Sequence, residues 1–243
     1  MKNLLFVSII MMTCSPSIGQ EHKIARNLDS FDRILIGPGV NVELIESDKE
    51  FIELVSDGEA MYDLDIEVKD NQLKVNYKLI DLDNNSDQKY SLKGTRYEDV
   101  VVDGKIYYRF LNELDFRGSH ELFTDEKFTA DEFAIKLFGA SEMSLANVVA
   151  RQLEIKLVGE NKLIIMDGEA ADLELRFVGD NEVSIRGMKA EDAQIKAIGD
   201  NEIDIYVAES LGVSTIGETK IRHKGDAKVK KFNIGETKLV KVD

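Results

Sequence analysis

The sequence predicts an all-β protein whose C-terminal half is a parallel β-helix, or β-solenoid. Two observations predict this fold. A glycine recurs every 18 to 21 residues from about residue 110 to the end, and apolar residues recur at fixed offsets from it. Within each repeat, apolar and polar residues alternate with the period of two that is typical of strands. A unit of this size cannot bury its apolar residues alone, so we predict about seven stacked coils.

The recurring glycines mark the corners of the predicted coils. They are Gly118, Gly139, Gly159, Gly179, Gly199, Gly217 and Gly235. We expect positive φ there, a conformation that glycine adopts at little cost. Two residues later come Asn161, Asn181 and Asn201, and asparagine is the next most tolerant residue of such a conformation.

Apolar residues recur at three positions around each glycine. Four residues after it stand Leu122, Met143, Leu163, Val183, Ile203, Ile221 and Leu239. Four residues before it stand Leu114, Ile135, Ile155, Leu175, Ile195 and Val213, and directly before it stand Phe138, Val158, Val178, Ile198, Ile216 and Ile234. We expect these side chains to be buried between coils. In the final repeat Lys231 and Lys241 replace apolar residues, which suits the exposed end of a stack.

Charged residues also form rows. Lys136, Lys156, Arg176 and Lys196 stand three residues before the glycine, and Glu154 and Glu174 stand five before it. On an outward face these rows are expected to offset each other, at a few tenths of a kcal/mol per exposed pair.

The N-terminal half has a different sequence pattern. Residues 28–110 are predicted to form an antiparallel β-sheet region, because short alternating segments are separated by turn residues. A polar segment, 79–98, is predicted to be a loop, and a hairpin is expected around Asp103-Gly104. The solenoid itself is assigned to residues 111–243.

The first residues are typical of a secretory signal peptide. Residues 1–19 contain Lys2, an apolar stretch and the small-residue site Ser17-Ile18-Gly19, so the mature chain is expected to begin at Gln20. An acylated Cys14, which would anchor the protein to a lipid, is the alternative. No other stretch is long and apolar enough to span a membrane. We therefore expect an exported protein, periplasmic or at the cell surface.

Composition restricts the possible partners. Asp and Glu outnumber Lys and Arg by 46 to 31, for a net charge of −15. Such a surface disfavours nucleic acid and anionic membranes. No cofactor motif is present in the sequence.

Acidic corners offer one candidate for metal chemistry. Asp180, Glu182, Asp200 and Glu202 stand beside successive corners and could supply oxygen ligands to calcium. The simpler interpretation is that they are turn residues, and we assign no metal site. His22, His120 and His223 are too far apart in sequence to suggest a catalytic or metal-binding group.

The pattern of strands and coils resembles a known family. Phe31-Asp32-Arg33-Ile34, then Val40 to Leu44, then strands and glycine-cornered coils, resemble the family called putative auto-transporter adhesin, head GIN domain, over about residues 28–243. The resemblance implies an exported protein with a β-helical body, and it transfers no catalytic residues. Acidic and amide corners here replace the small Gly-Ser corners usual in the family.

Together these observations predict an exported, non-enzymatic, adhesin-like binding or structural module of the cell envelope. Its partner stays open, with a cell-surface glycan or protein as the candidates. Two alternatives are a carbohydrate-active β-helix enzyme and a calcium-stabilised adhesin.

Overall fold

A computed structural model describes residues 21–57, 59–80, 82, 90–98 and 100–242. The predicted signal peptide, including Cys14, and part of the 79–98 segment lie outside the described residues. The remaining residues of 79–98 form turns and bends, with neither helix nor strand among them. No helix among the described residues has the length and apolarity needed to cross a membrane.

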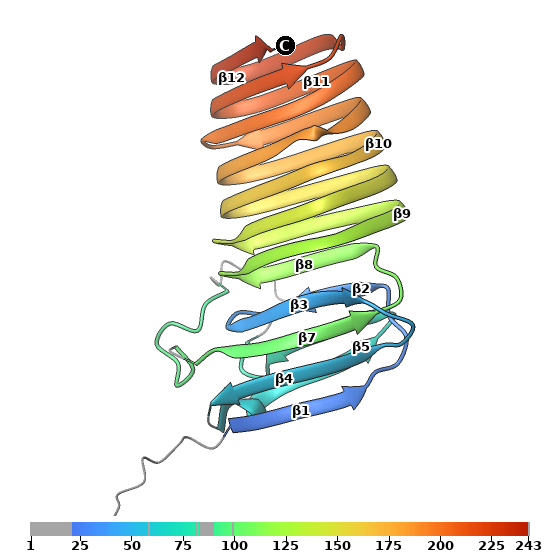
Figure 1. The fold of residues 1–243 in the computed structure, drawn as a ribbon. Coiled ribbons are helices and arrows are strands. Elements are labelled where there is room, and N and C mark those ends of the chain that lie inside the picture. Colours follow the sequence, from blue (N-terminus) through green and yellow to red (C-terminus); the bar gives the residue numbers. More distant parts are fainter. Residues whose placement is uncertain (1–20, 58, 81, 83–89, 99, 243) are drawn as a thin grey trace, which may run out of the picture.

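The C-terminal half is a β-solenoid of about six turns, close to the predicted seven (Figure 1). Its strands are β8 (Glu113–Gly118), β9 (Glu121–Gly139), β10 (Glu142–Ile198), β11 (Asn201–Lys224) and β12 (Lys228–Lys241). All neighbouring coils pair in parallel, and equivalent positions of the repeat face each other, as Gly159 faces Gly139 and Ile195 faces Val213. The sequence period is therefore the period of the coil.

Two of the three apolar rows form the solenoid core. The side chains four residues before the glycine are buried, as are those four residues after it until the final coil, where Leu239 is partly buried. Each fully buried Leu, Ile or Val side chain contributes about 1.5–3 kcal/mol relative to exposure. This core is continuous along the stack because every coil covers the apolar side chains of its neighbour.

All seven corner glycines have positive φ, between 102° and 131°. Space as well as conformation requires glycine here: a Cβ added at Gly179 would overlap the carbonyl oxygen of Gly159, and one added at Gly199 would overlap that of Gly179. The corners therefore stack backbone on backbone.

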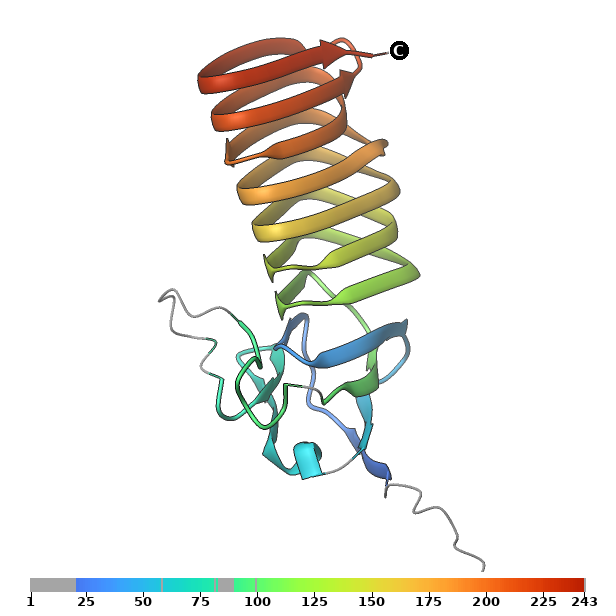
Figure 2. The ribbon, with the colours of Figure 1, turned by 90° about the vertical axis from the view of Figure 1, so that its left-hand side faces the viewer.

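The N-terminal region combines antiparallel and parallel pairing. It contains β1 (Glu21–Asn27), β2 (Arg33–Ile36), β3 (Val40–Glu46), β4 (Phe51–Asp57), β5 (Leu64–Lys69), β6 (Gln72–Tyr77) and β7 (Val102–Tyr108), with a 3-10 turn, η1 (Glu59–Asp63). The predicted antiparallel pairing occurs in β1–β4, β4–β7 and β5–β6, but β2–β6, β2–β8 and β3–β7 are parallel. Strand β2 thereby joins this region to the solenoid sheet, and η1 lies at the opposite end of the molecule from β12 (Figure 2).

The hairpin predicted at Asp103-Gly104 is wrong. Strand β7 runs straight through both residues and pairs with β3 on one side and β4 on the other. Gly104 is needed for close approach, since a Cβ there would overlap the Leu54 side chain. Asp103-Gly104 therefore marks close packing inside a sheet and not a turn.

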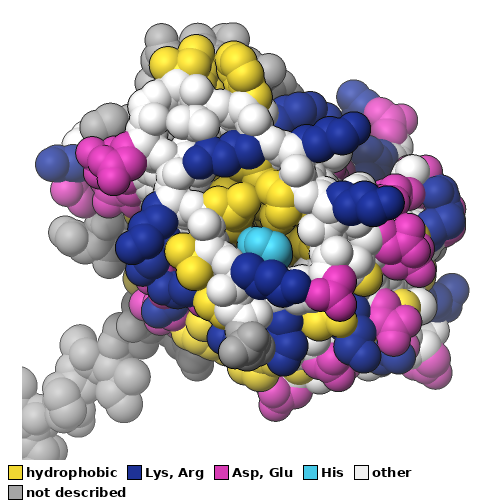
Figure 3. Space-filling model, turned by 90° about the horizontal axis from the view of Figure 1, so that it is seen from above, with side chains coloured by type: hydrophobic (Ala, Val, Ile, Leu, Met, Phe, Trp, Pro, Cys, Tyr) yellow, Lys and Arg dark blue, Asp and Glu magenta, His cyan; other side chains and the backbone are white. Residues whose placement is uncertain are grey.

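Polar side chains close the C-terminal end of the stack. Lys231 Nζ donates to the carbonyl oxygen of Thr237 at 2.6 Å, and Lys241 pairs with Asp226 at 2.7 Å. Seen from this end, Lys and Arg side chains surround a centre of apolar side chains and a histidine (Figure 3). An edge strand rich in lysine resists pairing with another chain.

Candidate binding surface

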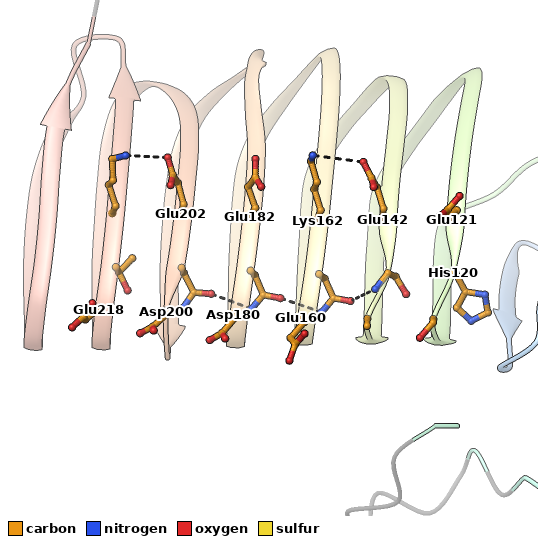
Figure 4. Close-up of a pocket in the computed structure, with 18 of the residues that line it drawn as sticks. His120, Glu121, Glu142, Glu160, Lys162, Asp180, Glu182, Asp200, Glu202 and Glu218 are labelled. Carbon is orange, nitrogen blue, oxygen red and sulfur yellow. Dashed lines mark hydrogen bonds and ion pairs between the residues drawn. The ribbon is translucent and has the colours of Figure 1, made fainter. Parts of the chain in front are cut away.

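A shallow groove of about 1280 Å³ follows the solenoid beside the glycine corners, from β3 and β9 to β12 (Figure 4). Its lining comes mainly from the three residues that follow the corner glycine of each coil. The middle residue of the three points inward and forms the floor, while the first and third form the two walls. Strand alternation places the three rows in this way.

The floor of the groove is a ladder of buried asparagines. Asn161 Nδ2 donates to Asn181 Oδ1 at 3.1 Å, and Asn181 Nδ2 donates to Asn201 Oδ1 at 3.0 Å. At one end Asn161 Oδ1 accepts from the Ser141 backbone N–H at 3.2 Å. Asparagine was expected here for its tolerance of positive φ, and that reason is wrong: Asp70 and Asn71 are the only non-glycine residues with positive φ in the described chain. The amides are selected for side-chain hydrogen bonding instead.

The first wall, which we call the acidic wall, is a row of carboxylates directly after the corner glycines. Glu160, Asp180, Asp200, Glu218 and Glu236 occupy it on five successive coils. Within the described chain none of the five makes an ion pair. Coils lie about 4.8 Å apart, so these like charges are close neighbours.

The second wall is mixed in charge. Lys162 lies 3.7 Å from Glu142, and Lys220 lies 3.1 Å from Glu202. The Lys220 hydrogen bond lowers the pKa of the Glu202 carboxyl, and Arg222 assists. Acids outnumber lysines on the two walls together, so the groove is negatively charged.

The third apolar row departs from the prediction. Side chains directly before the corner glycine point outward, and Val178, Ile198, Ile216 and Ile234 are 46–57% exposed. We call this row the apolar stripe, and it comprises Phe138, Val158, Val178, Ile198, Ile216 and Ile234. The expectation that all recurring apolar residues are buried is thus wrong for this row. Position parity explains the difference, because the residue before it, such as Phe177, faces the core.

The predicted charge rows lie beside the apolar stripe, and Arg176 and Lys196 of the basic row (Lys136, Lys156, Arg176 and Lys196) pair with the acidic row as expected. Arg176 contacts Glu174 at 2.8 Å and Glu154 at 3.2 Å, and Lys196 contacts Glu174 at 3.0 Å. These bonds, first that from Arg176, lower the pKa of the Glu174 carboxyl. Such exposed pairs contribute about 0.2–1 kcal/mol each.

Comparison with known proteins identifies the family. Residues 30–227 match the family described as "Putative auto-transporter adhesin, head GIN domain". The chain belongs to this family. No curated protein matches.

Solved structures share the head GIN fold. A putative adhesin from Bacteroides fragilis is 17% identical, with 92% of this chain and 97% of that chain covered and a TM-score of 0.72. A putative adhesin from Parabacteroides distasonis is 17% identical, with 93% and 98% covered and a TM-score of 0.67. A protein called a putative lipid binding protein, also from P. distasonis, is 20% identical, with 93% and 98% covered and a TM-score of 0.66.

The acidic residues proposed as calcium ligands in this head GIN protein fall on opposite walls of the groove. Asp180 and Asp200 belong to the first wall, and Glu182 and Glu202 belong to the second, with the asparagine floor between them. Glu202 is already bound by Lys220 and Arg222. Among the described residues no three His, Cys, Asp or Glu side chains gather closely enough to hold a metal ion.

The three histidines are not brought together. His22 lies on β1, while His120 and His223 lie near opposite ends of the solenoid. His120 Nε2 lies 3.0 Å from the Arg117 carbonyl oxygen, and burial lowers the pKa of His120. Burial also lowers the pKa of His223, and Lys241 adds to the effect.

A buried ion pair at the first coil was missed from the sequence. Asp115 and Arg117 form a two-pronged pair with bonds of 3.0 and 2.9 Å, and Asp115 is buried. The guanidinium also lies 5.5 Å from the Tyr90 ring centroid and 5.2 Å from that of Phe138, and it donates to the Leu82 carbonyl. This pair ties the 79–98 segment to the solenoid. The signal was present as Asp-Phe-Arg directly before a corner glycine.

Proposed function

We propose that this protein is an exported, adhesin-like binding module of the cell envelope that acts without catalysis. Export rests on the signal-peptide pattern of residues 1–19. The names of its family and of two structural relatives point to adhesion, although identities of 17% carry the fold alone.

One observation carries the proposal: the same side-chain rows are repeated along a rigid stack. The two walls and the asparagine floor of the groove each continue over several coils. Enzymes instead place a few groups at one site, and the pKa values of these groups are matched to the reaction. A repeated linear surface suits contact with an extended partner, and a cell-surface glycan or protein is the partner class we propose.

Binding and turnover can be measured on the same material. The purified chain is applied to arrays of cell-surface polysaccharides and, separately, incubated with uronic-acid polysaccharides while unsaturated or reducing ends are counted. We expect binding that weakens in Asp180→Asn/Asp200→Asn and no release of ends. A catalytic release of ends would support the carbohydrate-active alternative and contradict this proposal.

Export is tested separately by mass spectrometry of the mature N-terminus. We expect Gln20 to lead. An acylated Cys14 would show a lipid anchor, and an intact Met1 on protein from the envelope fraction would contradict the proposed cleavage.

A further inference from the structure

The C-terminal part of the apolar stripe, from Val178 to Ile234, is exposed and has no partner among the described residues, whereas Phe138 at its other end packs against Tyr90 and Arg117. The six side chains lie one per coil, so at about 4.8 Å per coil the stripe is roughly 24 Å long. The four most C-terminal of its members are each about half exposed. A continuous row of exposed β-branched side chains is typical of an interaction surface.

Opposite charges lie along the two sides of the stripe. On one side is the basic row, two residues before the stripe, with Lys156, Arg176 and Lys196. On the other side, across the glycine corner, is the acidic wall, with Glu160, Asp180 and Asp200 on the same three coils. On the coil of Gly159 the order across the surface is thus basic, apolar, acidic, while on the next two coils Arg176 and Lys196 are paired with Glu174.

We propose that the stripe is the interface between two copies of this protein, packed side by side with their solenoid axes parallel. The inference does not depend on the proposed function, because it uses the charges and exposure of the surface alone.

Symmetry makes the surface complementary to itself in this arrangement only. A two-fold axis parallel to the solenoid axis exchanges left and right, so each basic row meets the acidic wall of the other copy and stripe meets stripe. A two-fold axis perpendicular to the solenoid axis and lying in the interface would set basic against basic and acidic against acidic. Like charges juxtaposed across an interface are unfavourable.

The coil of Gly159 provides the clearest pair. Neither Lys156 nor Glu160 makes an ion pair within the described chain, and Lys156 Nζ lies over the Phe138 ring at 5.2 Å from its centroid. Both charges are therefore free to meet a partner. Association through the ends of the stack is disfavoured by comparison, because lysines cover the C-terminal end.

Sedimentation velocity over a wide range of concentration tests the location of the interface. We expect the full chain to form a dimer and the variant Ile198→Asp/Ile216→Asp to be monomeric. Met166→Asp is the matched control and should leave the dimer intact, because Met166 is also exposed but stands seven residues after Gly159, outside the apolar stripe. A wild-type chain that is monomeric throughout, a dimer that survives in the stripe variant, or a dimer lost equally in the control would overturn the proposal.

Charge reversal tests the parallel orientation and does not depend on the stripe variant folding well. Lys156→Glu and Glu160→Lys should each raise the dimer dissociation constant about tenfold, since two symmetric pairs are lost. The double variant exchanges the charges on both sides and should restore the wild-type constant. Failure of the double variant to recover would rule out the parallel arrangement.

Discussion

Asn181 Nδ2 donates a hydrogen bond to Asn201 Oδ1, 3.0 Å away on the next coil, and both side chains are buried. Equivalent residues therefore bind each other one repeat apart. A slip of one residue between coils would turn an amide outward and bring a carboxylate inward. The ladder thus fixes the register that aligns the surface rows.

Removing the middle asparagine tests the energetic role of the ladder. Asn181→Ala leaves Asn161 Nδ2 and Asn201 Oδ1 buried without partners, and each unsatisfied group costs about 1–3 kcal/mol. We expect the free energy of unfolding in urea to fall by about 2–4 kcal/mol. Glu182 is exposed and makes no ion pair with another described residue, so Glu182→Ala should change that free energy by less than about 0.5 kcal/mol. Equal effects of the two variants would contradict a structural ladder.

The coil period could be predicted from the sequence because stacking repeats every side-chain requirement once per coil. A glycine such as Gly179 or Gly199 is required at each corner where the backbone of one coil packs on the backbone of the next. The spacing of these glycines is visible in a single sequence. The prediction of burial did not use the alternation of inward and outward side chains along a strand. Positions one and four residues before the glycine differ by an odd number, so an alternating strand cannot bury both, and the apolar stripe follows from that.

Other features could not be predicted because they depend on contacts distant in sequence. Strand β2 pairs with both β6 and β8, and nothing in the local sequence indicates parallel rather than antiparallel partners. The Asp115–Arg117 pair is covered partly through contacts of Arg117 with Leu82 and Tyr90, which are distant in sequence. Tertiary context decides burial of this kind.

Breaking the buried pair should destabilise the protein strongly. Arg117→Met leaves the Asp115 carboxylate buried without its partner, which costs about 3–5 kcal/mol. The double variant Asp115→Asn/Arg117→Met should be less destabilised than Arg117→Met. Urea denaturation measures both, and a larger loss in the double variant would contradict the account of the pair.

Stability should fall as the pH falls below about 6.5. Burial lowers the pKa of His120 and of His223, so the unfolded chain, with an ordinary histidine pKa of about 6.5, takes up protons first. The stabilisation is therefore complete above that pH and is lost as the pH falls toward the folded values. The slope of stability against pH is measured by thermal unfolding from about pH 7.5 to about pH 5.5, a range that brackets the ordinary histidine pKa of about 6.5.

His120→Asn should reduce this pH dependence, because it removes one of the two groups and places an amide at the ladder position. An unaltered slope in His120→Asn would contradict the assignment.

The acidic wall should be a source of repulsion. Asp200→Asn removes one of five stacked carboxylates and should raise the free energy of unfolding by about 0.5 kcal/mol at low salt, with a smaller gain at high salt. Glu174→Gln should have the opposite sign, because Glu174 is paired with Arg176 and Lys196. Destabilisation by Asp200→Asn that appears only with added calcium would favour the calcium-stabilised alternative instead.

Stacking of the glycine corners is the claim on which all the surface rows depend, and a pair of alanine substitutions tests it most directly. Gly179 and Gly94 both have positive φ, 107° and 79°, but a Cβ would overlap the Gly159 carbonyl in the first case and meets nothing within 4 Å in the second. We expect Gly179→Ala to lower the free energy of unfolding by at least about 3 kcal/mol and Gly94→Ala by about 1–2 kcal/mol. Equal losses in the two variants would mean that the corner of Gly179 does not pack on the coil below.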